Sequence, residues 1–308
     1  MEFLEQQSFF VTMSDGHDIF VRTFKPNQVT MGHVHILHGM AEHSQRYEAF
    51  AEKLCEEGYF VTAHDHRGHG YTAQKNGMPG YYGDQNGFER VVEDVYEILA
   101  NLTEKTTGRP ILFGHSMGSF IARRFIQQHS GMIERLVLSG TGSSKLLHEA
   151  GHAIAGQLVK LQGAKEQSLL MHKLSFAGFN RHIENPKTNF DWLTTDDDEV
   201  KKYIEDPLCG FIATHQFFSD LTGGILTLKN KSQNERIRPD LKILLISGTL
   251  DPIADENGKS VLRTGTQLVE AGLEHVKVHL FEGMRHEVLN EKKKDQVMEI
   301  IVRWLKDE

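Results

Sequence analysis

Short apolar runs alternate with amphipathic helical patterns along most of this 308-residue chain, and no other feature constrains its fold as strongly. Runs that are apolar throughout are typical of strands buried on both faces, as in a parallel sheet covered by helices on both sides. The sequence therefore predicts an α/β fold with a mostly parallel sheet. The predicted strands are residues 34–37, 59–63, 111–113, 136–138, 243–246 and 276–280, and the predicted helices are residues 47–55, 88–99, 119–128, 256–271 and 295–305.

A different pattern precedes the first of these strands. The dipeptide Asp15-Gly16, which is typical of tight turns, lies between the apolar runs 9–12 and 19–23. The sequence therefore predicts an antiparallel hairpin near the N-terminus.

Residues 141–239 interrupt the alternation. They combine helical patterns with many bulky apolar residues, most of which we expect to pack within the segment itself. We interpret this segment as an inserted helical cap (residues 141–239) between the two parts of one core (residues 1–140 and 240–308).

The charge balance argues against a nucleic-acid partner. The chain has 34 Lys and Arg residues against 42 Asp and Glu residues, a net charge of −8, whereas nucleic-acid binding needs a basic face. No signal peptide is visible, and the longest apolar stretches fall far below the ~18 residues that span a bilayer. We therefore expect a soluble cytoplasmic protein, and its two cysteines, Cys55 and Cys209, suit a reducing compartment.

The segment Gly114-His115-Ser116-Met117-Gly118 fits the pattern G-x-S-x-G. A predicted strand ends just before it, and a helical pattern starts just after Ser116. A strand–turn–helix of this kind exposes a serine hydroxyl on a sharp turn, and the two glycines supply the room that the turn needs. Ser116 is therefore the predicted nucleophile. The alternative interpretation is an ordinary glycine-rich connection.

A serine hydroxyl needs a base to become a nucleophile. The chain has 18 histidines, so the candidate base must be identified by its position relative to the predicted strands. Where serine occupies such a turn, an acid and then a histidine follow on loops after later strands. Asp251 follows the strand predicted at 243–246, and His286 follows the last predicted strand. We predict that His286 takes the Ser116 proton and that Asp251 holds its tautomer. Asp255 is the alternative acid, although a role at the start of the next helix suits its position better.

The negative charge that develops on the substrate oxygen needs two backbone donors. We expect one to be the N–H of Met117, directly after the nucleophile. The loop after the strand predicted at 34–37 supplies the other, for which we predict the N–H of Met40. This chemistry requires no metal and no cofactor.

Residues 64–69 have the spacing H-x-H-x-x-H, which is also found in metal sites of the metallo-β-lactamase type. Those sites have Asp just before the last His, whereas this chain has Gly68 there. The alternative interpretation is a loop at the active-site edge of the sheet that structures the floor of the site.

With these motifs in place, the chain resembles the α/β-hydrolase superfamily, and within it the monoacylglycerol lipase / lysophospholipase group, whose domain is called serine aminopeptidase-like. The resemblance implies a catalytic core and an inserted cap that decides substrate choice. Tyr71 departs from the group's pattern, and the cap matches only through residues 191–194. The residues that carry the resemblance are HGMAEHSQRY (38–47), AHDHRGHG (63–70), GHSMG (114–118), GTLDP (248–252) and GMRHE (283–287).

The resemblance and the motifs together predict a serine hydrolase that cleaves carboxylic esters through an acyl-enzyme, as a monoacylglycerol lipase or lysophospholipase does. The apolar cap suggests a small lipid-like ester as substrate and transient membrane contact through the cap. One alternative is a proline-type aminopeptidase, which needs carboxylates such as Glu184, Glu205 or Asp206 for the substrate's ammonium group. Another is a non-catalytic binding module on the same fold.

Overall fold

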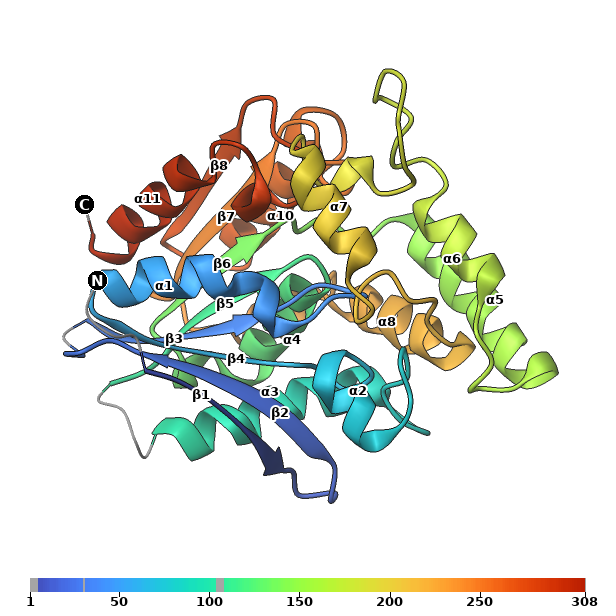
Figure 1. Cartoon of the computed structure of the whole chain (residues 1–308), viewed down its shortest axis with the longest axis horizontal. Helices are drawn as coiled ribbons and strands as arrows, with labels where there is room; N and C mark the ends of the chain where they lie inside the picture. The colour runs from blue at the N-terminus through green and yellow to red at the C-terminus, as the bar shows by residue number, and fades with distance from the viewer. Residues whose placement is uncertain (1–4, 30, 104–107, 308) are drawn as a thin grey trace.

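One eight-stranded sheet organises the molecule (Figure 1). The structure is a computed structural model that describes residues 5–29, 31–103 and 108–307. The strands are β1 (Glu5–Thr12), β2 (Asp18–Lys25), β3 (Gly32–Leu37), β4 (Tyr59–His64), β5 (Ile111–His115), β6 (Arg135–Ser139), β7 (Lys242–Gly248) and β8 (Val276–Phe281). Their order is β1-β2-β4-β3-β5-β6-β7-β8, and only the pairs β1/β2 and β2/β4 are antiparallel. This arrangement confirms the predicted α/β fold with a mostly parallel sheet.

The predicted hairpin is formed by β1 and β2. Their register pairs Thr12 with Asp18 at the turn and Glu5 with Lys25 at the open end. Both strands are longer than predicted, because pairing continues past the apolar residues on which the prediction rested.

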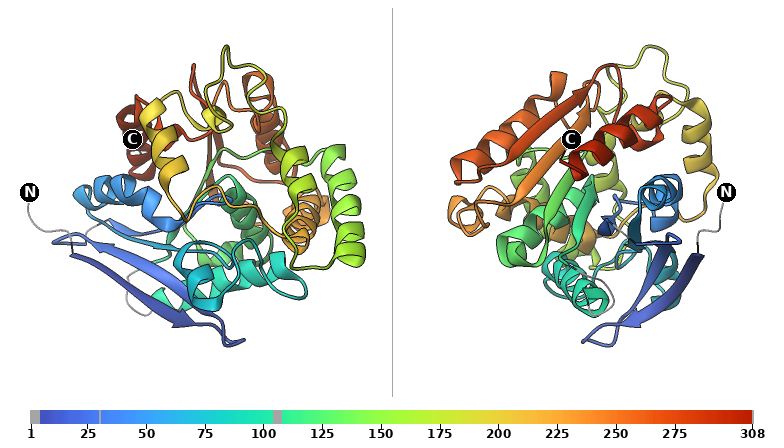
Figure 2. Two further views of the ribbon diagram at one scale, coloured as in Figure 1. Left: turned by 45° about the vertical axis from the view of Figure 1, so that its right-hand side comes forward. Right: turned by 90° about the vertical axis from the view of Figure 1, so that its left-hand side faces the viewer.

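Helices cover both faces of the sheet, as Figure 2 shows in its right-hand view. The helices α1 (Glu48–Glu56) and α11 (Lys294–Leu305) lie on one face, and α3 (Gly87–Thr103), α4 (Met117–His129) and α10 (Lys259–Glu270) lie on the other. Side chains of β5 alternate between the two layers. Phe113 belongs to the core cluster of α1 and α11, and its neighbour Leu112 belongs to that of α3 and α4. This two-sided burial explains why the central strands are apolar throughout.

Two local predictions need correction. The helix predicted at 256–271 begins only at Lys259, because Asn257 (φ 54°) and Gly258 (φ 73°) adopt left-handed conformations that an α-helix cannot include. The structure also contains α2 (Gly70–Asn76), which the apolar pattern did not indicate.

The segment between β6 and β7 contains helices and none of the strands of the sheet (Figure 1). Its helix α8 packs against α3 of the core and against α5 of the same segment. Buried side chains of α8, such as Phe217 and Ile225, share one hydrophobic cluster with Val91 and Phe125. The segment is therefore anchored on the core, and we call residues 141–239 the insert. Its helices are α5 (Leu146–Gln162), α6 (Leu169–Phe176), α7 (Asp197–Glu205), α8 (His215–Thr227) and α9 (Lys231–Asn234).

Among the described residues, no helix is both long enough and apolar enough to cross a membrane.

Gly248, the last residue of β7, touches the loop that leads to His286. A Cβ atom at this position would overlap the carbonyl oxygens of Met284 and Arg285. We expect Gly248→Ala to lower the free energy of unfolding by about 1–3 kcal/mol, because backbone must move to admit the methyl group. Urea denaturation measures this change.

Gly156→Ala is the matched control. Gly156 lies within α5 with open space around it, so the same methyl group should be neutral or stabilise the helix by up to about 1 kcal/mol. Equal unfolding midpoints for Gly248→Ala and the wild type would contradict the close approach.

Candidate active site

Ser116 lies on a tight turn between β5 and α4. Its backbone is strained, with φ 51° and ψ −117°, in a region that residues with side chains rarely adopt. The Ser116 N–H donates to the Ser139 carbonyl at 2.8 Å, and the Ser116 carbonyl accepts from the Ser119 N–H at 2.9 Å. These bonds to β6 and α4 hold the strained turn in place.

Gly114 and Gly118 provide the room that the turn requires. A Cβ atom on Gly114 would lie 2.6 Å from the carbonyl oxygen of Gly118. A Cβ atom on Gly118 would overlap the carbonyl oxygens of Leu37 and His38, at the end of β3. Helix α4 can therefore approach the sheet at this point only because both positions lack a side chain.

His286 and Asp251 form a buried pair on the loops after β8 and β7. His286 Nδ1 lies 3.0 Å from Asp251 Oδ2. The same carboxylate oxygen accepts from Ser247 Oγ at 3.0 Å, and Oδ1 accepts from the Ile253 N–H at 2.8 Å. The carboxylate is thus fixed on both oxygens and oriented toward the imidazole.

The alternative acid, Asp255, does not contact His286. Its carboxylate forms an ion pair with Lys145 of the insert at 2.5 Å. It does occupy the N-cap position of the short 3-10 helix that follows, as predicted, but its side chain makes no capping hydrogen bond there.

The neighbours of Ser116 bring it next to His286. The His115 ring lies 4.7 Å from the His286 ring, centroid to centroid. Gly140, which directly follows Ser139, faces the imidazole so closely that a Cβ atom there would lie 2.7 Å from His286 Cε1. Among the described residues, Ser116 Oγ makes no hydrogen bond.

The loop after β3, which contains Met40, passes beside the serine. Gly39 borders Ser116, since a Cβ atom on Gly39 would lie 3.2 Å from Ser116 Cβ. His38 Nδ1 donates to the Gly39 carbonyl at 2.7 Å. In a trans peptide this bond also fixes the direction of the Met40 N–H. The Met117 N–H occupies the first position of α4, where a helix offers no acceptor of its own.

A buried ion network that sequence patterns did not indicate joins the two loops of the site. Arg46 donates to Glu42 at 2.5 Å and to both oxygens of Glu287 at 2.6 and 2.7 Å. Glu42 also accepts from the Gly39 N–H at 2.5 Å. Glu287 directly follows His286, so the network ties the loop of Met40 to the loop of His286.

The insert also contacts the His286 loop. The His286 N–H donates to the Trp192 carbonyl at 3.4 Å, and the two rings lie 5.1 Å apart. The Glu287 N–H donates to the Leu193 carbonyl at 2.7 Å. In the sequence, this contact is indicated only by residues 191–194, the one stretch where the cap resembles that of the monoacylglycerol lipase group.

His286 and Asp251 each shift the other's pKa in the direction that stabilises the charged form. Burial by itself would lower the pKa of His286, but the charge and hydrogen bond of Asp251, with the charges of Glu287 and Glu42, outweigh it and raise that pKa. Burial would raise the pKa of Asp251, but the charge and hydrogen bond of His286 lower it. His115 differs, because burial lowers its pKa to about 3 and keeps it neutral.

The H-x-H-x-x-H segment forms part of a buried row of imidazoles. His64 Nδ1 lies 2.9 Å from His35 Nε2, and His64 Nε2 lies 2.9 Å from His66 Nδ1. His69 Nδ1 donates to the Arg67 carbonyl at 2.8 Å. Burial lowers the pKa of His64 to about 3, so the row stays neutral. Both nitrogens of His64 are engaged, and this segment therefore builds structure beneath the loop of Met40.

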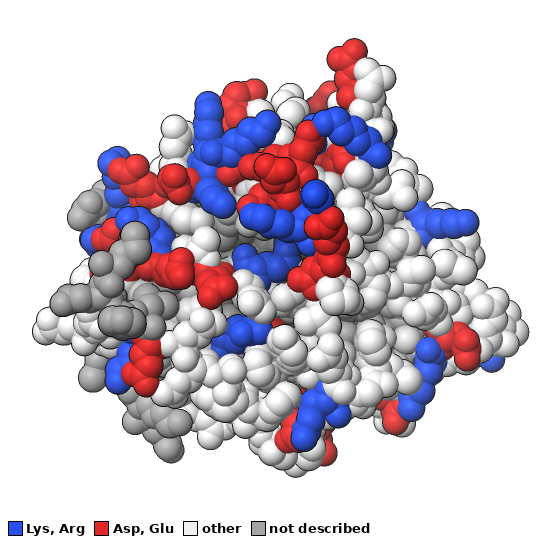
Figure 3. Space-filling view, viewed as in Figure 1, with Lys and Arg blue, Asp and Glu red and all other residues white. Residues whose placement is uncertain are grey.

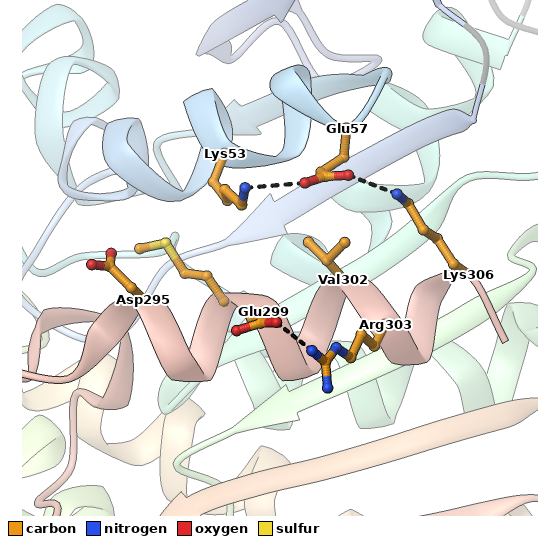
Figure 4. Close-up of a pocket in the computed structure, with 8 residues that line it drawn as sticks. Lys53, Glu57, Asp295, Glu299, Val302, Arg303 and Lys306 are labelled. Carbon is orange, nitrogen blue, oxygen red and sulfur yellow. Dashed lines mark hydrogen bonds and ion pairs between the residues drawn. The ribbon is translucent and has the colours of Figure 1, made fainter. Parts of the chain in front are cut away.

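A charged groove of about 420 Å³ lies elsewhere, between α1 and α11 (Figure 4). Glu57 pairs there with Lys53 at 3.0 Å and with Lys306 at 2.6 Å, and Glu299 pairs with Arg303. Its cations and carboxylates are equal in number, and none of the predicted site residues lines it.

Comparisons with known proteins agree with this geometry. The sequence profile of the serine aminopeptidase, S33, family matches residues 28–293. The chain belongs to this family. Human monoglyceride lipase is 30% identical over 258 residues, which cover 81% of this chain and 75% of that protein. The monkeypox virus monoglyceride lipase homolog is 25% identical over 94% of this chain and 95% of its own length.

Solved structures of the family's α/β-hydrolase fold are similar along the whole chain. A thermostable carboxyl esterase from Bacillus coagulans, in complex with glycerol, superimposes with a TM-score of 0.91 at 27% identity. The superposition covers 99% of this chain and 99% of the esterase chain. These likenesses place the chain in the monoacylglycerol lipase group of the superfamily.

The aminopeptidase alternative needs acidic residues of the insert to hold the ammonium group of the substrate. In the structure these residues either pair with another side chain or are exposed. Asp206 pairs with His43 at 2.8 Å. Glu205 is paired at 3.8 Å with Lys201 at the surface, and Glu184 is exposed. None of the three contacts the His286 loop, so the aminopeptidase alternative is not favoured.

The electrostatic environment assigned to His286 can be tested directly by measuring its pKa. We expect its pKa, followed by NMR titration of the ring protons, to lie above the ordinary value of 6.5. Asp251→Asn should lower that pKa, because the largest stabilising charge is removed while burial remains.

Asp255→Asn is the control for this titration, since Asp255 pairs with Lys145. It should leave the pKa of His286 unchanged. A His286 pKa below 6.5 in the wild-type protein would show that burial dominates and would contradict the assigned field.

Proposed function

We propose that this chain hydrolyses carboxylic esters of small lipid-like molecules, with Ser116 as nucleophile. The observation that carries the proposal is the strained Ser116 turn, whose neighbours His115 and Gly140 lie against His286 of the buried His286–Asp251 pair. Membership of the S33 family and the likeness to monoglyceride lipases and a carboxyl esterase support it. The finer assignment, a monoacylglycerol lipase or lysophospholipase, belongs to the same proposal.

In the first half of the reaction, Ser116 Oγ attacks the ester carbonyl carbon. His286 Nε2 takes the hydroxyl proton. Asp251 Oδ2, 3.0 Å from His286 Nδ1, accepts the hydrogen bond of the Nδ1 proton and stabilises the imidazolium. The raised pKa of His286 suits this step, since a base accepts a proton more readily as its pKa rises. His286 then protonates the leaving alcohol, which leaves the acyl group on Ser116.

The negative charge on the carbonyl oxygen is met by the N–H groups of Met40 and Met117. One such donor is worth about 10²–10³-fold in rate, because it is already oriented when the charge develops. The hydrogen bond from His38 to the Gly39 carbonyl supplies that orientation for Met40. In the second half, His286 activates a water that releases the acid from Ser116.

The insert is proposed as the cap of the site, with the core formed by residues 1–140 and 240–308. Aromatic rings extend from the site into the insert. Trp192 lies on His286, and Tyr82, which donates to Met117 Sδ at 2.8 Å, lies 4.6 Å from the Phe217 ring. The apolar Trp192 ring against His286 favours an acyl chain over a polar substrate.

The outer face of the insert is proposed to contact membranes transiently. Figure 3 shows that the surface over α5 and α6 is mostly uncharged, whereas charges of both signs gather around α1, α7 and α11. A row of leucines on an amphipathic helix is suited to the boundary between lipid headgroups and acyl chains. The exposed leucines of α5 and α6 are Leu146, Leu147, Leu161, Leu169, Leu170 and Leu174. The expected cytoplasmic location stays a prediction.

Ser116→Ala tests the nucleophile. We expect hydrolysis of p-nitrophenyl esters and monoacylglycerol to fall by at least about 10⁴-fold, because a methyl group cannot form the acyl-enzyme. Circular dichroism should remain that of the wild type, and a fluorophosphonate should label the wild type alone. A variant that keeps its activity would refute the assignment.

Ester chain length tests the substrate class. On p-nitrophenyl esters from acetate to palmitate, we expect the rate to peak at medium or long chains. A peak at acetate would still support a serine esterase, but it would contradict the proposal of a lipid-like substrate. Turnover of aminoacyl naphthylamides in place of esters would favour the aminopeptidase, and failure to react with a fluorophosphonate would favour a non-catalytic module.

The membrane contact is tested by the double variant Leu146→Ser, Leu161→Ser, since both side chains are about 80% exposed and support no core. Flotation with phosphatidylcholine vesicles should weaken by at least about tenfold, because burying one leucine is worth about 1.5–3 kcal/mol. Leu262→Ser on α10, at 47% exposure, is the control and should float as the wild type does. Equal flotation of the wild type, the double variant and the control would contradict the proposed membrane contact.

A further inference from the structure

Three side chains that the proposed reaction does not use meet where the insert touches the loop of Met40. One ligand atom each from His43, Asp206 and Cys209 lies within 4.8 Å of the other two. His43 belongs to the loop after β3, and the other two follow α7 in the insert. Within the part of the chain that the structure describes, no other group of His, Cys, Asp and Glu side chains meets in this way.

The donor set is chemically selective. An imidazole nitrogen, a carboxylate oxygen and a thiol sulfur together suit Zn²⁺, which is commonly bound by N, O and S ligands in tetrahedral sites. Mg²⁺ and Ca²⁺ prefer oxygen ligands alone. Three protein ligands leave the fourth tetrahedral position for water.

The cluster is held in place before any ion binds. Asp206 Oδ2 lies 2.8 Å from His43 Nε2, and its other oxygen accepts from the Leu208 N–H at 2.8 Å. The Gly210 N–H donates to the Ala41 carbonyl at 2.9 Å, so the two segments are already tied at their backbones. The His43 side chain is only 4% exposed, whereas Asp206 is 29% exposed and gives access from solvent.

The surrounding charges favour a divalent cation. Burial raises the pKa of the Cys209 thiol, Glu42, Asp206 and Glu287 add to the rise, and Arg46 opposes it only in part. Arg46 is itself held between Glu42 and Glu287. Together with Asp206, these groups place two more negative than positive charges around the cluster when His43 is neutral. A divalent cation would offset that excess in a region of low dielectric constant.

We propose that His43, Asp206 and Cys209 bind Zn²⁺, which bridges the insert to the loop of Met40. Cys209 loses its thiol proton to solvent and binds as thiolate. The Nε2 lone pair of His43 binds the ion, so its ring proton moves to Nδ1, an atom with no hydrogen-bond partner among the described residues. The metal takes the place of the His43–Asp206 hydrogen bond, and no bond to the substrate is made or broken on it.

Binding is tested on the full-length protein after treatment with a chelator. Calorimetry with Zn²⁺ should give one site, and Zn²⁺ should raise the thermal midpoint whereas Mg²⁺ should not. Cys209→Ser and Asp206→Asn should each weaken binding by more than about 10–100-fold, the loss that second-shell changes alone produce at zinc sites. Cys55→Ser, at the buried cysteine beside Phe24, is the matched control and should bind as the wild type does.

Co²⁺ identifies the thiolate. In the wild type, Co²⁺ should give a thiolate-to-metal absorption band that disappears in Cys209→Ser and persists in Cys55→Ser. Absence of binding at equimolar metal, or binding that Cys209→Ser leaves unchanged, would overturn the site. Unchanged binding in that variant would point to adventitious contacts among the 18 histidines. These readouts need no substrate, and Ser116→Ala should give the same result, so failure of the metal site and failure of the esterase proposal are distinguishable.

Discussion

The position of the candidate active site depends on the buried guanidinium of Arg46. It is bound on one side by Glu42, which also holds the Gly39 N–H and the Tyr47 hydroxyl, and on the other by Glu287, next to His286. Removing one partner would leave a buried charge unpaired, at a cost of about 3–5 kcal/mol. The loop of Met40 and the loop of His286 must therefore keep their relative position, although 241 residues separate Arg46 from Glu287.

The insert closes over the same network. The Tyr203 ring lies 4.9 Å from the Arg46 guanidinium carbon, and its hydroxyl donates to the Ala41 carbonyl at 2.9 Å. Trp192 contacts the His286 loop through both its carbonyl and its ring. Any displacement of the insert must break contacts to both loops of the site. Movement of the insert would therefore disturb the geometry of the site.

Local sequence patterns predicted much of this arrangement. Uninterrupted apolar runs indicated the strands, and position after a strand was enough to bring Asp251 and His286 together. Arg46 and Glu287 both lie in segments that carry the family resemblance, but no local pattern indicates that the two side chains pair. The start of α10 was missed for a different reason: the prediction followed the apolar spacing and did not use Asn257-Gly258, whose residue types readily adopt the left-handed conformations seen there. Local patterns thus predicted the alternating strands and helices, but they could not indicate which charged residues pair across the fold.

The network also sets the charge around His286. Arg46 outweighs burial and lowers the pKa of Glu287 to about 2, so this carboxylate stays ionised at any pH at which the protein works. Its charge and that of Glu42 help to raise the pKa of His286, which brings a general base closer to the range where it both accepts and returns a proton. The same carboxylates give the proposed zinc cluster its negative surroundings. A cation bound there would oppose their effect on His286, so one set of buried charges links the base of the proposed reaction to the contact between insert and core.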